Sequence, residues 1–313
     1  MVDYILAVDG GGSKTAFCIA DVEKKNKVYF YTGSTSFKSV GIKEAQKNLE
    51  LGLGKIQRNM DITFDKIKYS VFGLSGIDCD KDYEILARVI MKAGVKENFY
   101  LCNDSELALY AASDIPGIIV IAGTGSIVLG INSEGKKIRI GGWSYDFSDL
   151  GSGFWIGKEI LKYTVLYCDG CYSYHPIFSR ILSYYNIDKF KALPVFLTGR
   201  KNNYPEIASL ARLVIEGGKR EESLPLKILD EAAYYLAQYT YSVYKGLSLN
   251  NTDINIVMSG GVMKNQVVME RFKIKLTDKI GSQDKISFIT VDKEPVDGGI
   301  VMAQKILHNG MIH

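Results

Sequence analysis

The stretch ILAVDGGGSKT, residues 5–15, decides the fold. Its apolar run ends in the carboxylate Asp9, three glycines follow, and a second apolar run continues from Ala16. This pattern predicts a strand, a tight turn and another strand. The backbone N–H groups of a glycine turn can bind anions, and a carboxylate beside them can hold a cation. The stretch therefore indicates either a site for a metal-bound phosphate group or an ordinary hairpin whose Asp9 caps the turn. A short glycine motif alone does not distinguish these two alternatives.

The composition is that of a folded protein without a nucleic-acid or membrane partner. Its 313 residues suffice for about two domains, and 47% of them are hydrophobic and 23% charged. A formal charge of +3 does not indicate binding to nucleic acid or to an acidic membrane surface. We find no signal-peptide pattern and no apolar stretch near the roughly 20 residues that cross a bilayer. Five cysteines cannot all pair within one chain, so we expect free thiols and a cytoplasmic protein.

The pattern of the first stretch returns in the second half of the chain. A strand at 117–122 ends in the turn Gly123–Gly125, and two more strands follow, as they do after Gly10–Gly12. This repeat predicts an α/β protein of two related domains with a cleft between them. The other expected strands are 3–9, 15–22, 27–34, 68–74, 99–102, 127–131, 137–142, 254–257 and 286–291. The expected helices are 42–60, 80–93, 104–112, 152–168, 176–184, 188–198, 205–217, 222–248, 264–280 and 297–307.

A third glycine turn, Gly260-Gly261, also follows an expected strand. The three turns together resemble the phosphate-1, phosphate-2 and adenosine motifs of the actin, sugar kinase and Hsp70 ATPase superfamily. Within that superfamily the chain is most similar to the BadF/BadG/BcrA/BcrD ATPase and N-acetylglucosamine kinase family. The motifs that carry the resemblance are DGGGSKT at 9–15, LSG at 74–76, NDS at 103–105, AGTGS at 122–126, GGW at 141–143, DLGSGFWIG at 149–157, SGG at 259–261 and DGG at 297–299.

The resemblance implies two ribonuclease H-like (actin-like ATPase) domains with a central nucleotide cleft. We assign residues 1–115 to the N-terminal domain and residues 116–313 to a C-terminal domain with helical insertions. The closing helix, about 297–313, is a candidate to return to the N-terminal domain. A homodimer is the default expectation for the assembly.

Two chemistries compete within the resembled family. Its kinases transfer the γ-phosphoryl group of ATP to an amino sugar, whereas its activators couple ATP hydrolysis to electron transfer from an iron–sulfur cluster in aid of a dehydratase. The activators carry a cysteine close to their AGTG motif, and residues 116–121 of this chain contain none. The single Cys168–Cys171 pair is more typical of an incidental spacing than of a metal site. We therefore expect a kinase for N-acetylglucosamine, N-acetylmuramic acid or both, using ATP and Mg²⁺; the alternatives are an activator and a non-catalytic sugar sensor.

Asp104 is the candidate general base. Phosphoryl transfer needs a base beside the acceptor hydroxyl, and Asp104 lies where an expected strand passes into an expected helix. The resemblance matches it to the catalytic aspartate of the kinases. The same position suits a helix N-cap, and the two roles are compatible.

The nucleotide residues are implied by the resemblance. Asp9 would orient Mg²⁺, partly through water. Ser13, Thr15 and Thr124 would donate to the phosphates. Lys14 adds positive charge or is a solvated turn residue, and Gly218 lies near the adenine or caps a helix. The full set is Asp9, Gly11, Gly12, Ser13, Lys14, Thr15, Gly123, Thr124, Gly125, Gly218, Gly260 and Gly261.

The sugar residues implied in the same way include Trp143, whose indole either covers an apolar sugar face or is a core residue. Two positions depart from the family. Ser36 stands where the kinases place an asparagine, and Leu150 stands where they place a glutamate. Both changes suit a bulkier or acidic substrate such as N-acetylmuramic acid. The full set is Ser36, Ser75, Gly76, Asn103, Ser126, Gly142, Trp143 and Asp149.

Overall fold

The chain folds into two compact units in a computed structural model. The structure describes residues 3–23, 26–60, 62–95, 97–113, 117–199, 204–249, 253–281, 285–291 and 293–310. One unit comprises Met1–Gly117, Asn132–Lys136 and Val291–His313, and the other comprises Ile118–Ile131 and Lys137–Thr290. The expected domain boundary between residues 115 and 116 lies outside the described residues.

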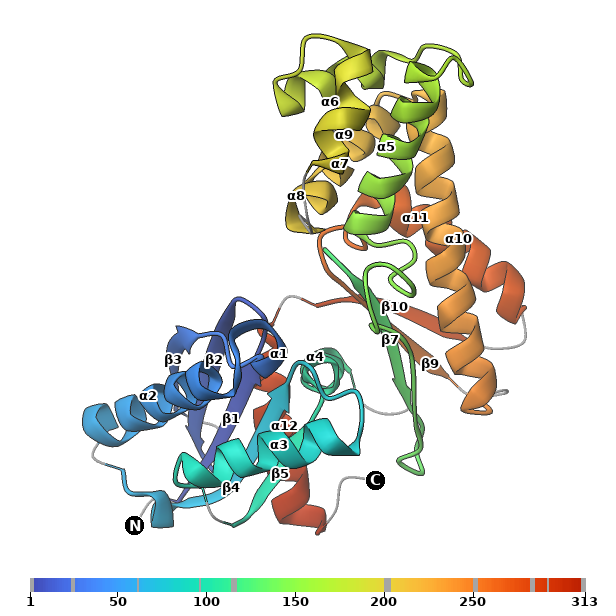
Figure 1. Ribbon diagram of the computed structural model, residues 1–313. Coiled ribbons are helices and arrows are strands. Elements are labelled where there is room, and N and C mark those ends of the chain that lie inside the picture. The colour runs from blue at the N-terminus through green and yellow to red at the C-terminus, as the bar shows by residue number, and fades with distance from the viewer. Residues whose placement is uncertain are drawn as a thin grey trace. The chain divides into compact units, whose positions relative to one another are not determined.

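The first unit contains a five-stranded sheet in the order β3-β2-β1-β4-β5 (Figure 1). β1 pairs antiparallel with β2 and parallel with β4, and β5 pairs parallel with β4. Parallel strands bring their carboxyl ends to one edge, so Gly10 pairs with Leu74, and Gly73 pairs with Cys102. The strands are β1 (Tyr4–Gly10), β2 (Lys14–Asp21), β3 (Lys27–Gly33), β4 (Ile67–Leu74) and β5 (Phe99–Cys102).

Helices cover both faces of this sheet. Alternate residues of a strand point to opposite faces. Leu6 and Val8 belong to a buried cluster with apolar residues of α2 and α3, whereas Ala7 faces Gly299 of α12. α12 packs closely on α4, because a Cβ on Gly298 would overlap the carbonyl oxygen of Leu107. The helices are α1 (Phe37–Val40), α2 (Ile42–Met60), η1 (Phe64–Lys66), α3 (Asp80–Lys92), α4 (Asp104–Ala112) and α12 (Pro295–Asn309).

The second unit repeats the topology of the first. Its sheet order is β10-β9-β6-β7-β8. Reversed, this order is β8-β7-β6-β9-β10, in which each strand is the counterpart of the strand at the same place in β3-β2-β1-β4-β5. The antiparallel β7–β8 and parallel β9–β10 pairs also match their counterparts. The repeat expected from the sequence is therefore confirmed. The strands are β6 (Gly117–Ala122), β7 (Ser126–Ile131), β8 (Lys137–Gly141), β9 (Ile254–Ser259) and β10 (Ile286–Thr290).

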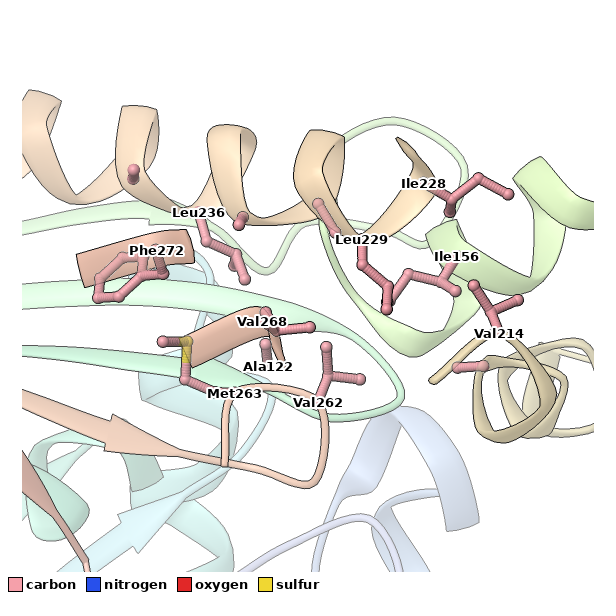
Figure 2. Close-up of a cluster of buried hydrophobic side chains, with 14 of the residues drawn as sticks. Ala122, Ile156, Val214, Ile228, Leu229, Leu236, Val262, Met263, Val268 and Phe272 are labelled. Atoms are coloured by element: carbon pink, nitrogen blue, oxygen red, sulfur yellow. The ribbon is translucent and has the colours of Figure 1, made fainter. Parts of the chain in front are cut away.

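One buried cluster joins this second sheet to its helices. Figure 2 shows Ala122 at the end of β6 beside Met263 and Val268, beneath Leu229 and Leu236 of α10. Burial of a Val, Leu or Met side chain contributes about 1.5–3 kcal/mol. The helices are α5 (Gly153–Cys168), α6 (Pro176–Tyr185), η2 (Phe190–Ala192), α7 (Leu193–Thr198), α8 (Tyr204–Ser209), α9 (Ala211–Lys219), α10 (Ser223–Gly246) and α11 (Gln266–Ile280).

Two of the expected helices need correction, and one α-helix lies where none was expected. The helix expected over 205–217 is two helices, α8 and α9, which meet at the fully buried Leu210. The one expected over 188–198 is the short η2 followed by α7. The four-residue α1 was not expected, because it is too short to show a helical period. None of the helices in the described ranges combines the length and apolarity needed to cross a membrane.

Candidate active site

The first glycine turn connects β1 to β2 at the carboxyl edge of the sheet. Gly11 N–H donates to the Lys14 carbonyl at 3.1 Å, and Ser34 Oγ donates to the Gly11 carbonyl at 2.9 Å. Gly10 has no room for a side chain, because a Cβ there would overlap Thr35 Oγ1. The loop after β3 therefore packs against the turn and fixes its backbone. Gly12, Ser13 and Lys14 are left exposed.

Thr15 belongs to the sheet and not to the exposed part of the turn. Its side chain is fully buried, and its hydroxyl donates to the Gly33 carbonyl at 2.8 Å and lies 3.0 Å from Thr35 Oγ1. We therefore withdraw Thr15 as a phosphate donor. The neighbouring Lys14 points the other way, as strand alternation requires, and its Nζ lies 5.0 Å from the centre of the Tyr31 ring.

Asp9 lies beside other carboxylates at this edge. Burial raises the pKa of Asp9 to about 7, with further contributions from the negative charges of Asp104 and Glu294, while Lys14 opposes them. A divalent cation would relieve this repulsion. Among the residues described, no group of three or more His, Cys, Asp and Glu side chains could hold a metal ion. The single carboxylate of Asp9 fits Mg²⁺ that takes its remaining ligands from phosphate and water.

Asn103, and not Asp104, caps α4. The Asn103 Oδ1 accepts hydrogen bonds from Ser105 N–H at 3.1 Å and from Ser105 Oγ at 2.5 Å. Asp104 is the first residue of the helix and is half-buried. The N-cap alternative for Asp104 is therefore wrong. The carboxylate still gains from the helix N-terminus, where negative charge is favoured.

Residues expected to bind sugar follow β4 and β3. Ser75 N–H donates to the Gly10 carbonyl at 2.8 Å, while Ser75 Oγ is buried without a hydrogen-bond partner in the described part of the chain. Gly76 has a φ of +92°, which favours glycine. Ser36 is buried, and its Oγ accepts from Ser39 Oγ at 3.2 Å. These residues therefore gather at the same edge as Gly10.

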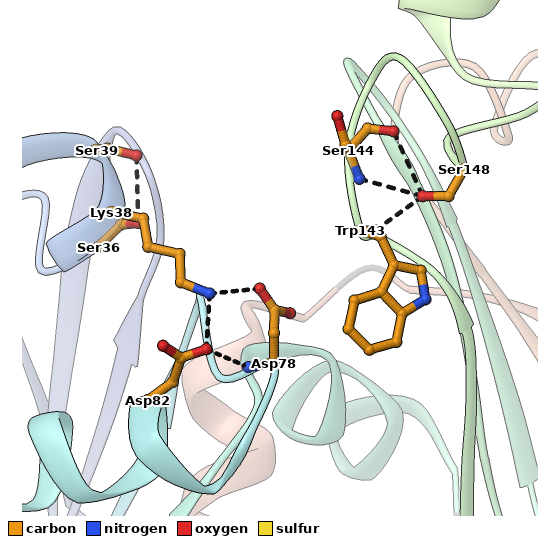
Figure 3. A network of polar contacts seen from close by, with 8 residues as sticks. All are labelled: Ser36, Lys38, Ser39, Asp78, Asp82, Trp143, Ser144 and Ser148. Carbon is orange, nitrogen blue, oxygen red and sulfur yellow. Dashed lines mark hydrogen bonds and ion pairs between the residues drawn. The ribbon is translucent and has the colours of Figure 1, made fainter.

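Lys38 lies beside Gly76 and is not predicted from the sequence. Its Nζ donates to Asp78 at 2.6 Å and to Asp82 at 2.7 Å (Figure 3). Its stem lies 3.5 Å from the position of a Cβ on Gly76. The ion pairs fix α1 to the start of α3. No motif signalled this residue, because α1 is a single turn.

The pKa of Asp9 predicts a pH-dependent stability in the absence of metal. Asp9 titrates near pH 4 when unfolded, so between about pH 4 and 7 the folded chain binds the extra proton. The contribution of Asp9 to the free energy of unfolding therefore falls as pH rises through this range, by at most about 4 kcal/mol. We expect Asp9→Asn to gain stability relative to wild type between pH 5 and pH 8, measured by urea unfolding in EDTA.

Asp80→Asn is the matched control for this measurement, since Asp80 is an exposed carboxylate in the same unit. Its stability relative to wild type should change little between the two pH values. An equal change in stability relative to wild type for the Asp9 and Asp80 variants would contradict the raised pKa of Asp9.

The second glycine turn, Gly123–Gly125, is held by the start of α5. Gly153 N–H donates to the Gly123 carbonyl at 2.7 Å, and Phe154 N–H donates to the Thr124 carbonyl at 3.0 Å. Ser152 Oγ caps α5 by accepting from Trp155 N–H at 3.1 Å. The motif at 149–157 therefore shapes the turn, because two N–H groups of its helix bind the turn carbonyls.

Asp149 forms hydrogen bonds with both the second glycine turn and the loop after β8. Its carboxylate accepts from Ser148 Oγ at 3.2 Å and from the backbone N–H groups of Ser126 and Gly142. Burial nevertheless raises the pKa of Asp149. A Cβ on Gly125 would overlap Asp149 Oδ2. Asp149 thus connects the glycine turn to the loop after β8.

Ser126 and Trp143 differ in exposure. Ser126 is buried, and its Oγ donates to the Leu150 carbonyl at 2.9 Å. Trp143 is 61% exposed, so the core alternative for this residue is wrong. The Arg139 guanidinium lies 4.3 Å from the Trp143 ring centre, and Trp143 N–H donates to Ser148 Oγ at 2.9 Å (Figure 3).

The third glycine turn packs directly on the end of β6. Val262 and Met263 donate their N–H groups to the Ala122 carbonyl at 2.9 and 3.1 Å. A pocket of about 370 Å³ opens beside this junction. Two of the three glycine turns therefore border one cavity. Its lining comprises Gly123, Thr124, Gly153, Pro205, Ala208, Ser209, Ala211, Arg212, Ile215, Gly261 and Val262.

Gly218 does not line this pocket. It is a buried residue within α9, where a Cβ would lie 2.5 Å from Leu229 Cδ1 of α10. Arg220 is the C-cap residue of α9, so the cap alternative for Gly218 is wrong. The wall of the pocket comes instead from α8 and the start of α9, which carry no recognisable motif.

Comparisons with known proteins agree over nearly the whole chain. A model of the BadF/BadG/BcrA/BcrD ATPase family matches residues 6–301. An N-acetylmuramic acid/N-acetylglucosamine kinase from Clostridium acetobutylicum is 28% identical over 307 residues, 96% of this chain and 98% of the relative. An N-acetyl-D-glucosamine kinase from Dictyostelium discoideum is 26% identical over 284 residues, 85% and 88% of the two chains. The structure of a candidate N-acetylglucosamine kinase from Chromobacterium violaceum has a TM-score of 0.74 at 21% identity and covers 96% of this chain and 99% of that one.

Proposed function

Because the chain belongs to the BadF/BadG/BcrA/BcrD ATPase family, we propose that it is an ATP-dependent kinase for an N-acetylated amino sugar, namely N-acetylglucosamine, N-acetylmuramic acid or both. The fold is α/β with two ribonuclease H-like units of the actin-like ATPase type. The observation that carries the proposal is the repeated sheet, because each of the two sheets has a glycine turn at the carboxyl end of its central strand. In the first unit, Asp9 and Asp104 lie at that same edge of the sheet. The names of the relatives supply the substrate class.

In this proposal, Asp104 is the general base. Its carboxylate accepts the proton of the sugar hydroxyl as that oxygen bonds to the γ-phosphorus of ATP. The bond from the γ-phosphorus to the bridging oxygen breaks, and ADP leaves. A base held in this way contributes about 10²- to 10⁴-fold to the rate.

The nucleotide would be held by residues of both glycine-turn edges. Ser13 and the N–H groups around Gly11 and Gly12 would donate to phosphate oxygens, and Lys14 would add charge. Thr124 with Gly123 and Gly125 would bind phosphate in the second unit, and Gly260 and Gly261 would border the nucleoside. Mg²⁺ bound near Asp9 would neutralise phosphate charge. Thr15, whose hydroxyl is bonded within the sheet, and Gly218, which is packed against Leu229, are not among the proposed direct contacts.

The sugar would contact the polar groups beside each strand edge. Ser75 Oγ, which lacks a partner in the described chain, is suited to a sugar hydroxyl. The exposed Trp143 indole is suited to an apolar sugar face. Asn103 retains its amide donors after its oxygen caps α4. Ser36, Gly76, Ser126, Gly142 and Asp149 shape the surrounding loops.

An ATP-consumption screen across amino sugars tests the proposal. We expect turnover with N-acetylglucosamine or N-acetylmuramic acid, with a sugar phosphate as product. ADP formation that no sugar stimulates would favour the activator alternative, and sugar binding without ATP turnover would favour the sensor. Absence of sugar phosphate with both substrates would reject the proposal.

Three further expectations remain proposals. We place the protein in the cytoplasm, where ATP is available, and we expect a homodimer that light scattering can detect. We keep residues 1–115 as the N-terminal domain and residues 116–313 as the C-terminal domain, except that the closing helix from about residue 297 belongs to the N-terminal domain. The packing of α12 on β1 and α4 supports that assignment.

A further inference from the structure

Arg212 is the one charged residue in the described lining of the pocket beside the second glycine turn. The remaining lining consists of glycines, small or apolar residues and the hydroxyls of Thr124 and Ser209. Ser209 is already engaged, because its Oγ donates to the Glu206 carbonyl at 2.6 Å and lies 2.5 Å from Tyr184 OH. Arg212 therefore supplies the positive charge of the described lining.

Arg212 is exposed and has no polar partner among the described residues. Within the described ranges it forms no hydrogen bond or ion pair, whereas Arg180 pairs with Glu222 and Arg271 pairs with Asp230. Val214, two residues further on in α9, is fully buried (Figure 2). Successive helical residues are rotated by about 100°, so Arg212 lies on the face nearly opposite Val214, and Ile215 shares that face.

Arg212 belongs to the part of the pocket lining that comes from α8 and the start of α9. A Cβ on Gly153 would lie 2.9 Å from the Gly123 carbonyl and 3.3 Å from the Ala208 carbonyl, so the start of α5 packs on both the second glycine turn and α8. α9 starts directly after α8, and Arg212 lies in its first turn. Ile215 lies nearly one helical turn further along. The lining thus combines the second glycine turn, the cationic Arg212 and the apolar Ile215.

We propose that Arg212 binds the α- or β-phosphate of the nucleotide, while Ile215 borders the nucleoside. This inference rests on the proposed nucleotide site. A guanidinium offers five N–H donors in a planar fork that matches phosphate oxygens. A charge-assisted hydrogen bond of this kind at an exposed position is worth about 1.4 kcal/mol, which corresponds to a tenfold change in affinity.

Calorimetric titration of adenosine, AMP, ADP and ATP into wild type and Arg212→Gln tests the assignment. We expect the variant to lose about tenfold in affinity for ADP and ATP and to bind adenosine like wild type. The loss should shrink at high salt, because salt screens exposed charges. Arg212→Lys keeps the charge without the fork and should lose less than Arg212→Gln.

Lys219→Gln is the matched control, since Lys219 is an exposed cation in the last turn of the same helix and does not line the pocket. Its affinities should equal those of wild type. An equal loss for adenosine and ATP in Arg212→Gln would assign Arg212 to the nucleoside and overturn the proposal, as would unchanged ATP affinity. The titrations contain no sugar. A chain that binds ATP through Arg212 but phosphorylates no amino sugar would therefore reject only the proposed function.

Discussion

Asp104→Asn is expected to lower kcat for sugar phosphorylation by about 10²- to 10⁴-fold while leaving ATP affinity close to that of wild type. The carboxamide has nearly the shape of the carboxylate but cannot accept the hydroxyl proton. Asn103 caps α4, so the substitution leaves the cap of that helix intact. Steady-state kinetics with saturating ATP and calorimetric ATP binding measure the two quantities separately.

Asp80→Asn is the control for charge at a helix start. Asp80 is the first residue of α3, as Asp104 is of α4, and it is exposed. Both substitutions remove a negative charge from a helix N-terminus, which costs about 0.3–1 kcal/mol of stability. Only the Asp104 variant should lose turnover. A kcat within tenfold of wild type for Asp104→Asn would assign the base to another residue.

The same substitution has a second consequence at Asp9. The negative charge of Asp104 is the second contribution to the raised pKa of Asp9, after burial. Removing it should lower the pKa of Asp9, so that Mg²⁺ competes with fewer protons near neutral pH. Mg²⁺-dependent ATP affinity of Asp104→Asn should therefore vary less between pH 6 and pH 8 than that of wild type.

The sequence predicts the strand edges well because the relevant signals are local. An apolar run that ends in a glycine turn specifies both a buried strand and the point where the chain leaves it. Gly10–Gly12, Gly123–Gly125 and Gly260-Gly261 all follow such runs, and all three follow strands in the structure. The same signal predicts the positions of Asp9 and Asp104, since each stands at or just after the end of a strand.

The pocket wall could not be predicted in the same way. Apolar spacing identifies the buried face of the segment 205–217, but it does not show that the helix divides at Leu210. Nor does it show which residues on the other face border a cavity. Arg212 and Ile215 are therefore known only from the structure. Thr15 is different, because strand alternation after the exposed Lys14 already places it in the interior.

Gly260→Ala is expected to destabilise the second unit by about 2–4 kcal/mol. Gly260 has a φ of +91°, a conformation that costs a residue with a Cβ about 1–2 kcal/mol. The added Cβ would also overlap the Ala122 carbonyl oxygen, which accepts hydrogen bonds from Val262 and Met263. The third glycine turn would have to move away from β6. Scanning calorimetry without nucleotide measures the loss as a lower midpoint.

Gly261→Ala separates this structural requirement from nucleotide binding. A Cβ at Gly261 would meet no atom within 4 Å, and the residue lines the pocket. Its unfolding midpoint should remain close to that of wild type. The new methyl group would occupy space beside the proposed nucleoside, so the KM for ATP should rise while stability does not fall. Adjacent glycines would then serve distinct purposes, one allowing the turn to pack on β6 and the other keeping the cavity open. Equal destabilisation by both substitutions would contradict that division.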